Sequence, residues 1–181
     1  SWRTVCLGKR ILKPGSRIWV MPGIVCPTRF QDVRSFVLVD PAAFESVRFD
    51  VERLQGGAVL RDADDFRFRR IAGTDTVAFA ATAKDIGERY VFARVRVMAS
   101  GARETETAFL TVTQPGTNAV PPVVRSVAAS RGDSSWQMVC AGKVSLTNGT
   151  TVVVSPGTNE APQSVDVRDV LLVPPELFGE Q

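Results

Sequence analysis

The sequence predicts an all-β protein in which two small duplicated β units flank an inserted antiparallel β-sandwich. Residues 1–44 align without a gap to residues 135–178, and 18 of the 44 pairs are identical. About three identities are expected by chance between segments of ordinary composition. Between the two copies, short runs alternate apolar and polar residues, and none shows a helical period. These observations indicate an internal duplication interrupted by a β-rich insertion.

The identical pairs fall into three groups that describe a small β unit. Glycine and proline mark turns, and Trp, Val, Leu and Phe fill the strands between them. The groups in the first copy, each matched 134 residues later, are Ser1, Trp2, Val5, Cys6, Gly8, Lys9 and Leu12; Gly15, Val20, Pro22 and Gly23; and Asp32, Val33, Arg34, Leu38, Val39, Pro41 and Phe44. We expect Trp2, Trp136, Phe44 and Phe178 to be anchors in a shared core or at a subunit contact.

We expect four segments along the chain: a first β copy over residues 1–45, an immunoglobulin-like sandwich over 46–114, a connector over 115–134, and a second copy over 135–181. A unit of about 44 residues rarely buries enough apolar surface to fold alone. The copies are therefore expected to pack on each other as one domain, or to pack on neighbouring subunits. Within the connector, residues 123–128 are a candidate for one further strand.

Five runs in the insertion predict strands, at residues 47–51, 66–69, 77–83, 90–98 and 107–113. Each has the length of a strand, and most alternate apolar and polar side chains, as half-buried strands do. One predicted face carries Val91, Ala93, Val95 and Val97 in the fourth run and Ala108, Leu110 and Val112 in the fifth. Strands of this length and spacing favour an antiparallel sandwich.

The segment Asp85-Ile-Gly-Glu-Arg-Tyr90 resembles the corner before a late strand of immunoglobulin-like domains, where a Tyr after an Asp-x-Gly turn packs against the corner. The spacing to the Tyr is one residue longer than usual. The resemblance covers about residues 46–114. It implies an immunoglobulin-like fold of the disulfide-free kind found in bacterial surface proteins and bacteriophage virion proteins. Such domains mostly bind other molecules or decorate the surface of a larger assembly.

The three cysteines do not form a simple disulfide pattern. Cys6 and Cys140 occupy equivalent positions in the copies, whereas Cys26 has Glu160 as its counterpart. We therefore expect Cys6 and Cys140 to be buried thiols in the core. Cys26, which has no cysteine counterpart, is a candidate for an intermolecular disulfide. Histidine and Cys-x-x-Cys spacing are both absent from the sequence, which argues against a zinc site.

The sequence also lacks the residue patterns of common active sites. Without histidine, Ser-His-Asp and Cys-His catalysis are excluded, and no phosphate-binding loop motif is present. We therefore predict that the chain is not an enzyme and that it uses no cofactor. Asp62, Asp64 and Asp65 are a candidate for a calcium site between β domains, and a solvated turn is the alternative.

Two sets of arginines are candidates for contacts. Arg34 and Arg168 each follow Asp-Val in the duplicated motif, so each is expected to hold a buried or interfacial ion pair, including one with the Asp of the motif in a neighbouring copy. The alternative is an ordinary ion pair within the chain. In the insertion, Arg67, Arg69, Arg94 and Arg96 would form a basic stripe for an acidic partner if their strands pair. The alternative is an ordinary solvent-exposed face.

Charge and composition restrict the function further. The net charge is only +3, and no apolar run is long enough to span a membrane, so we expect neither nucleic-acid binding nor membrane insertion. We predict a non-enzymatic structural protein of a bacteriophage virion, as a capsid decoration, neck or tail surface protein. Its partners would be copies of itself and a capsid or tail protein, docked through the duplicated units. The alternatives are a secreted bacterial surface or adhesin module with an immunoglobulin-like binding domain, and an accessory domain of an enzyme.

Overall fold

The computed structural model describes residues 11–18, 51–100, 105–116, 122–130, 135–158 and 162–178. The predictions made for five residues, Trp2, Cys6, Cys26, Arg34 and Phe44, lie outside these ranges. Phe178 ends a short helix, and its side chain is not described. Among the described residues, no helix is long and apolar enough to cross a membrane.

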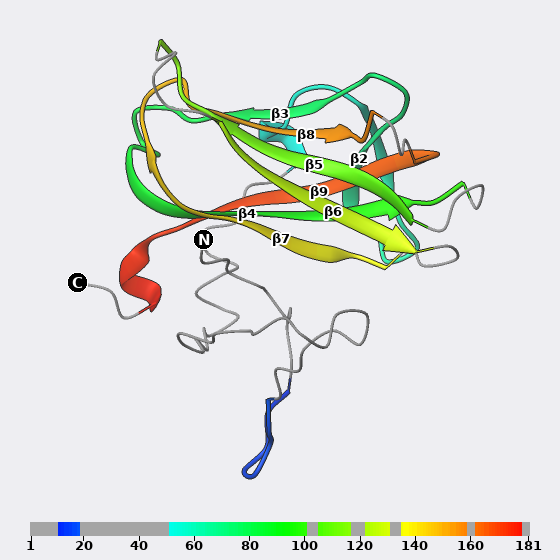
Figure 1. Ribbon diagram of the computed structural model, residues 1–181, viewed down its shortest axis with the longest axis horizontal. Helices are drawn as coiled ribbons and strands as arrows, with labels where there is room; N and C mark the ends of the chain where they lie inside the picture. The colour runs from blue at the N-terminus through cyan, green and yellow to red at the C-terminus, as the bar shows by residue number, and fades with distance from the viewer. Residues whose placement is uncertain are drawn as a thin grey trace, which may run out of the picture.

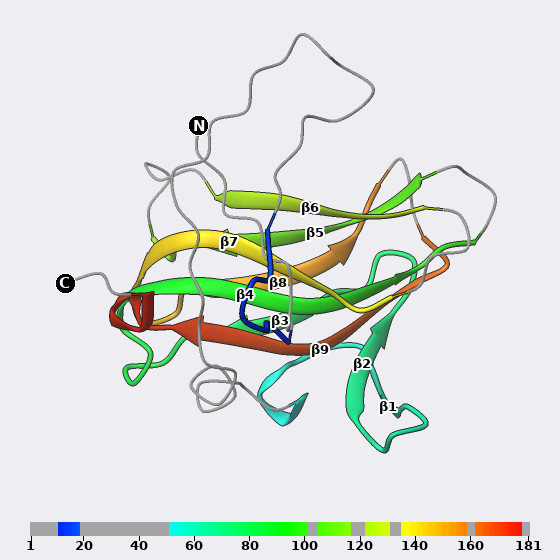
Figure 2. The same cartoon turned by 90° about the horizontal axis from the view of Figure 1, so that it is seen from below.

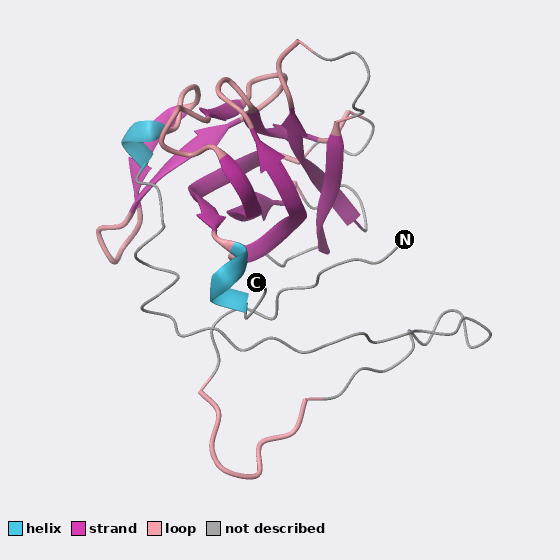
Figure 3. Cartoon of the chain, turned by 90° about the vertical axis from the view of Figure 1, so that its left-hand side faces the viewer, coloured by secondary structure: helices cyan, strands magenta, loops and turns pink. Residues whose placement is uncertain are grey.

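The described strands form two antiparallel sheets that pack face to face (Figures 1 and 2). The five-stranded sheet has the order β1 (Ala58–Arg61), β2 (Arg67–Ile71), β9 (Ser164–Val173), β4 (Gly87–Met98) and β7 (Gln137–Leu146). The four-stranded sheet has the order β3 (Val77–Ala80), β8 (Thr151–Pro156), β5 (Thr105–Thr113) and β6 (Val123–Ser130). The short 3-10 helices η1 (Val51–Arg53) and η2 (Pro175–Phe178) are drawn in cyan in Figure 3. The predicted all-β class and antiparallel sandwich are confirmed.

The strands of the second copy lie inside this sandwich. Strand β9 lies between β2 and β4, β8 lies between β3 and β5, and β7 pairs with β4. This arrangement differs from the predicted division, in which a sandwich over residues 46–114 was separate from a unit over 135–181. The insertion does not close its own sheets, because each sheet needs strands from the second copy. The strand expected in the connector is present as β6.

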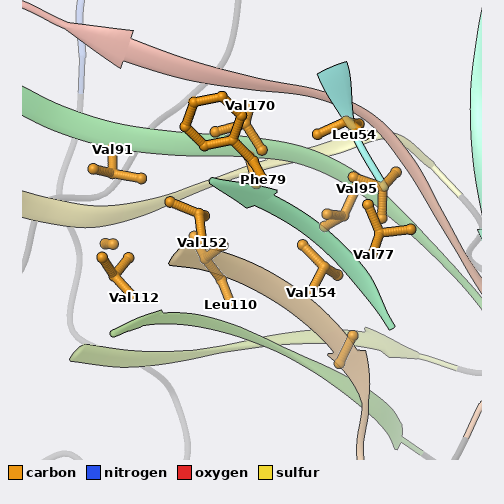
Figure 4. Packing of buried hydrophobic residues seen from close by; sticks show 14 of the residues in the cluster. Leu54, Val77, Phe79, Val91, Val95, Leu110, Val112, Val152, Val154 and Val170 are labelled. Atoms are coloured by element: carbon orange, nitrogen blue, oxygen red, sulfur yellow. The ribbon is translucent and has the colours of Figure 1, made fainter. Parts of the chain in front are cut away.

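The main core fills the space between the two sheets, and Figure 4 shows part of it. In β4 the predicted apolar face is buried, with all four of its members fully inaccessible: Val91, Ala93, Val95 and Val97. The facing residues of β5 are also buried, as predicted: Ala108, Leu110 and Val112. Burying one such Val or Leu side chain contributes about 1.5–3 kcal/mol to the stability of the fold. Burial of these alternating apolar side chains is therefore the main interaction that holds the two sheets together.

A second, smaller cluster lies on the other face of the five-stranded sheet. It contains Phe92, Cys140, Leu171 and Val173, all buried, with Tyr90 packed against them. Cys140 is a buried thiol, as predicted, and its Sγ accepts a hydrogen bond from the Gly142 N–H at 3.3 Å. The five-stranded sheet is therefore apolar on both faces over part of its area.

The turn before β4 is held by the carboxylate of Asp85. This carboxylate accepts hydrogen bonds from the Thr82 backbone N–H at 2.8 Å, the Thr82 hydroxyl at 2.9 Å and Arg53 at 3.0 Å. Burial raises the pKa of Asp85, but these hydrogen bonds and the charge of Arg53 outweigh it, and the pKa lies below its usual range. The Asp of the predicted corner thus stabilises the turn, while the Tyr of that corner packs into the second cluster.

Two turns at equivalent positions of the copies have the same local geometry. Gly15 and Gly149 both have φ +84°, in the left-handed region that favours glycine. In the first turn, Ser16 N–H donates to the Lys13 carbonyl at 2.9 Å, and Thr150 N–H donates to the Thr147 carbonyl at 3.0 Å in the second. The hydroxyl at the fourth position accepts a hydrogen bond from the first backbone N–H in both turns, at 2.8 and 2.9 Å. The duplicated sequence therefore encodes the same turn twice.

Candidate binding face

The candidate site lies on the outer face of the five-stranded sheet, the face that points away from the four-stranded sheet. The strand register brings three charged side chains together there. Arg70 of β2 and Arg96 of β4 are both directly opposite Asp166 of β9. Side chains directly opposite one another in antiparallel strands are close enough for contact. The central position of β9 therefore places one carboxylate between two guanidinium groups.

Asp166 is fully buried and accepts four hydrogen bonds. Arg70 binds in a bidentate manner, with Nε to Oδ1 at 2.6 Å and Nη2 to Oδ2 at 2.9 Å. Arg96 donates to Oδ2 from Nε at 2.9 Å and from Nη2 at 2.6 Å. The hydrogen bond to Asp166 raises the pKa of Arg70, against the opposing effect of burial. Because arginine is already charged at all physiological pH values, this arrangement fixes geometry and is not a pH switch.

Aromatic rings cover the two arginines. The Arg96 guanidinium carbon lies 4.6 Å from the ring centroid of Trp136 and 5.3 Å from that of Phe68. The corresponding distance from Arg70 to Phe68 is 5.5 Å. The two rings meet edge to face, with centroids 5.9 Å apart and an interplanar angle of 74°. Stacking of guanidinium on aromatic rings adds attraction and restricts the rotation of the arginine side chains.

A β-bulge extends this arrangement toward the sheet edge. The register between β4 and β9 shifts between Arg94 and Val95, so Arg168 is the additional residue on β9. Its guanidinium carbon lies 3.8 Å from the centroid of Phe66, which is 44% exposed. We call the whole set the Arg–aromatic cluster, and its members are Phe66, Phe68, Arg70, Arg96, Trp136, Asp166 and Arg168.

Two of the residues predicted as contact sites belong to the Arg–aromatic cluster. Trp136 is half-buried in the Arg–aromatic cluster, and Arg168 stacks on Phe66. The carboxylate of the duplicated Asp-Val-Arg motif, Asp166, is the central ion-pair member. Sequence reasoning considered the Asp only as a partner for the Arg of the motif in a neighbouring copy, and it missed Arg70. A signal for Asp166 was present, because this Asp is identical in both copies and lies between two valines of a predicted strand.

The condition for the basic stripe is not met. It required the strand of Arg67 and Arg69 to pair with that of Arg94 and Arg96, but β9 lies between them. Arg69 donates to the Val51 and Gly56 carbonyls at 3.0 and 2.8 Å. Arg67 pairs with Glu52, and Arg94 and Arg96 lie against Asp169 and Asp166. Two buried carboxylates thus offset the positive charge that an acidic partner would need.

The acidic segment Asp62-Ala-Asp-Asp65 forms the turn between β1 and β2. The Oδ1 atom of Asp62 accepts hydrogen bonds from the backbone N–H groups of Asp64 and Phe66, at 3.1 and 2.9 Å. Asp65 pairs with Arg61 at 2.5 Å. Within the described ranges, no group of three or more Asp, Glu, Cys or His side chains is arranged to hold a metal ion. Asp62 therefore acts here as a turn-forming residue.

Comparisons with known proteins give matches only at the level of structure. No family model and no curated protein matches the sequence. A carbohydrate-binding module from Clostridium stercorarium, solved with cellobiose, has a TM-score of 0.46 at 14% identity, covering 72% of this chain and 94% of its own. Carbohydrate-binding and catalytic modules of a Clostridium thermocellum xylanase, solved with xylohexaose, give 0.49 at 12% identity, covering 70% and 27%. The globular domain of zebrafish complement 1qA gives 0.38 at 17%, covering 54% and 68%. These low scores do not indicate what this chain binds.

Proposed function

We propose that the chain is a non-enzymatic binding module and that the Arg–aromatic cluster is its contact face for a protein partner. The observation that carries the proposal is the stacked set of Phe68, Arg96 and Trp136 around the buried Asp166. Trp and Arg are enriched among the residues that contribute most to binding at protein interfaces. In this cluster Phe66 and Arg70 are the more exposed members and Trp136 is half-buried, whereas Phe68 and Asp166 are buried and support them from below.

The cluster is rigid before any partner arrives. Two hydrogen bonds and two aromatic rings fix the guanidinium of Arg96, and two hydrogen bonds fix that of Arg70. Immobilising a flexible side chain at an interface costs about 0.5–1.5 kcal/mol. Because these side chains are already ordered, a partner that contacts them avoids most of this cost.

The shape of the face favours a protein over a small ligand. Small-molecule sites are usually concave and apolar, with a few convergent polar groups. The Arg–aromatic cluster lies on the face of a sheet. An open groove adjoins the cluster at Arg70, but no aromatic ring lines it; its lining residues are Gly56, Gly57, Ala58, Arg70, Ile71, Ala72, Thr74, Asp75 and Thr76. A partner that covers several strands suits the cluster better.

Of the contexts that the sequence suggests, that of a binding module matches this face better than a structural role in a virion. The Arg–aromatic cluster supports a binding role, whereas the described residues provide no observation that is specific to a capsid, neck or tail. The virion assignment, the cell-surface alternative and the predicted partners remain predictions from the sequence.

Selective capture of partner proteins tests the proposal. Immobilised wild-type protein and a Phe66→Ser/Arg168→Ala double variant would be exposed to the same extracts and secreted fractions of the source organism. A Leu177→Ser variant is the matched control, because Leu177 is similarly exposed but lies on η2. We expect proteins that bind the wild type and the control and that the double variant loses. An identical set on all three, or none on any, would contradict the proposal.

A further inference from the structure

The turn at residues 11–18 is less buried than its counterpart in the second copy, and it exposes apolar side chains. Leu12 is 46% exposed, whereas its counterpart Leu146 is 1% exposed and belongs to the main core. Ile18 is half-buried, whereas its counterpart Val152 is 1% exposed. Ile11 is 89% exposed. The counterpart of Ile11 is the exposed Ser145, so the first copy differs there by an exposed apolar side chain, and at Leu12 it exposes a group that the second copy buries.

The sandwich has no second set of strands that could bury the apolar side chains of the first turn in the way that it buries Leu146 and Val152. The second copy packs through β7, β8 and β9 against four strands of the insertion. Three of these strands are already paired on both sides: β2 with β1 and β9, β4 with β9 and β7, and β5 with β8 and β6. Within the described part of the chain, the positions that bury Leu146 and Val152 are thus filled. The exposed turn of the first copy requires a different surface.

A matching surface is present at the β1 edge of the five-stranded sheet. All four residues of β1 are exposed, and β1 pairs with β2 alone among the described strands. Val59, Leu60 and Phe66 are 49%, 37% and 44% exposed there. Edge strands with exposed apolar side chains are templates for association. Phe66 also belongs to the Arg–aromatic cluster, so this edge is continuous with the proposed contact face.

Charge supports the same pairing. The turn carries Lys13 and Arg17, both exposed. The β1–β2 turn carries Asp62, Asp64 and Asp65 directly beside Leu60 and Phe66. Arg61 offsets only one of these carboxylates, that of Asp65. The acidic tip of the hairpin, next to Leu60, therefore complements the basic turn, whereas Arg67 and the stacked Arg168 lie on the Phe66 side. This difference in charge across the acceptor favours one docking orientation, with Lys13 and Arg17 toward the acidic tip.

We propose that the turn at residues 11–18 of one chain docks on the β1–β2 hairpin, residues 58–71, of a second copy of this chain. The inference rests on the proposed binding function and names the partner. Because the two surfaces differ, the contact is head to tail, and repeated contacts form a ring or an open polymer. The acidic segment, which has no other assigned role beyond its turn, then contributes to the acceptor.

Sedimentation velocity of the full chain tests this proposal, with Leu12→Asp altering the turn and Leu60→Asp altering the hairpin. Val124→Asp is the control, because Val124 is 45% exposed on the edge strand of the other sheet. We expect concentration-dependent oligomers for the wild type and the control, and monomers for each docking variant. An equimolar mixture of the two docking variants should form a one-to-one dimer, since one intact turn and one intact hairpin remain.

A monomeric wild type at every concentration would overturn the proposal, as would oligomers that neither substitution reduces or a mixture that stays monomeric. Circular dichroism of each variant checks that it folds. A Lys13→Glu/Arg17→Glu variant provides a second test that changes no apolar residue, and it should also reduce association. If self-association fails while the capture experiment remains selective, only the choice of partner is wrong and the proposed function stands.

Discussion

At the scale of single residues, Asp166 determines how β2, β9 and β4 fit together. It is the only carboxylate within hydrogen-bonding distance of both Arg70 and Arg96 among the described contacts. A strand slip of one residue would move it to the opposite face and leave a buried charge between the sheets. The buried ion pairs therefore specify register in a sheet where apolar residues occupy both faces.

Replacing Asp166 tests this role. In Asp166→Asn the shape is preserved, but two guanidinium groups lose their shared anion. We expect a loss of about 3 kcal/mol in the free energy of unfolding, at the low end for a broken buried ion pair, because Arg70 is partly exposed. Urea unfolding measures the change, with exposed Asp64→Asn as the control. A loss below about 0.5 kcal/mol, as is usual for surface substitutions, would contradict the account.

Trp136 contributes through stacking and partial burial. Truncation in Trp136→Ala removes its contacts with Phe68 and Arg96. Because the ring is half-buried, we expect a loss of about 1–3 kcal/mol, below the 3–5 kcal/mol of a fully buried Trp. Thermal unfolding measures it. Trp136→Phe keeps a ring over Arg96 and should recover part of the loss, whereas equal effects of both substitutions would argue against stacking.

Asp85 gives the protein an acid-sensitive turn. Its pKa is lower in the folded than in the unfolded protein, so the stabilisation is fully present above the unfolded value of 3.8 and is lost as the pH falls through the folded value. We expect Asp85→Asn to destabilise the protein at pH 7, and the difference from the wild type to shrink below about pH 4. Unfolding measured from pH 7 to pH 3 checks this. A difference that stays constant over this range would contradict the assignment.

At the scale of elements, the two copies of one sequence occupy different environments. Leu146→Ala should cost about 2–5 kcal/mol, because it leaves a cavity in the main core. Leu12→Ala, at the equivalent position, should change the free energy of unfolding by less than about 0.5 kcal/mol, because its side chain is largely exposed. Measuring both in the monomeric Leu60→Asp background separates folding from association. Equal losses would show that the copies pack alike.

The sequence predicted which segments form strands better than it predicted which strands pair with each other. Alternation identified the buried face of β4 and β5, because one apolar residue in two is sufficient to define a half-buried strand. The division into domains followed chain order, but strands 70 or more residues apart are neighbours here, as Arg70 and Asp166 show. Alternation fixes which side of a strand is buried and contains no information about which strand lies beside it. The Arg–aromatic cluster could not be predicted for this reason, since it requires the order β2, β9, β4, β7.

At the scale of the whole molecule, the second copy completes a sandwich that the insertion begins. Both sheets depend on it, since β9 is central in one and β8 is central in the other. Removing residues 135–181 would therefore expose the core of residues 58–113, and truncated chains should not fold. The same arrangement leaves the exposed turn of the first copy available for contact with another chain.

Native-state hydrogen exchange tests this account most directly, because it measures opening strand by strand. If the second copy is part of one cooperative sandwich, amides of β8 and β9 will exchange only through global unfolding, with the same free energy as those of β4 and β5. If β7, β8 and β9 instead open together at a lower free energy while β4 and β5 stay protected, the second copy is a separate unit and the account of a single sandwich is wrong.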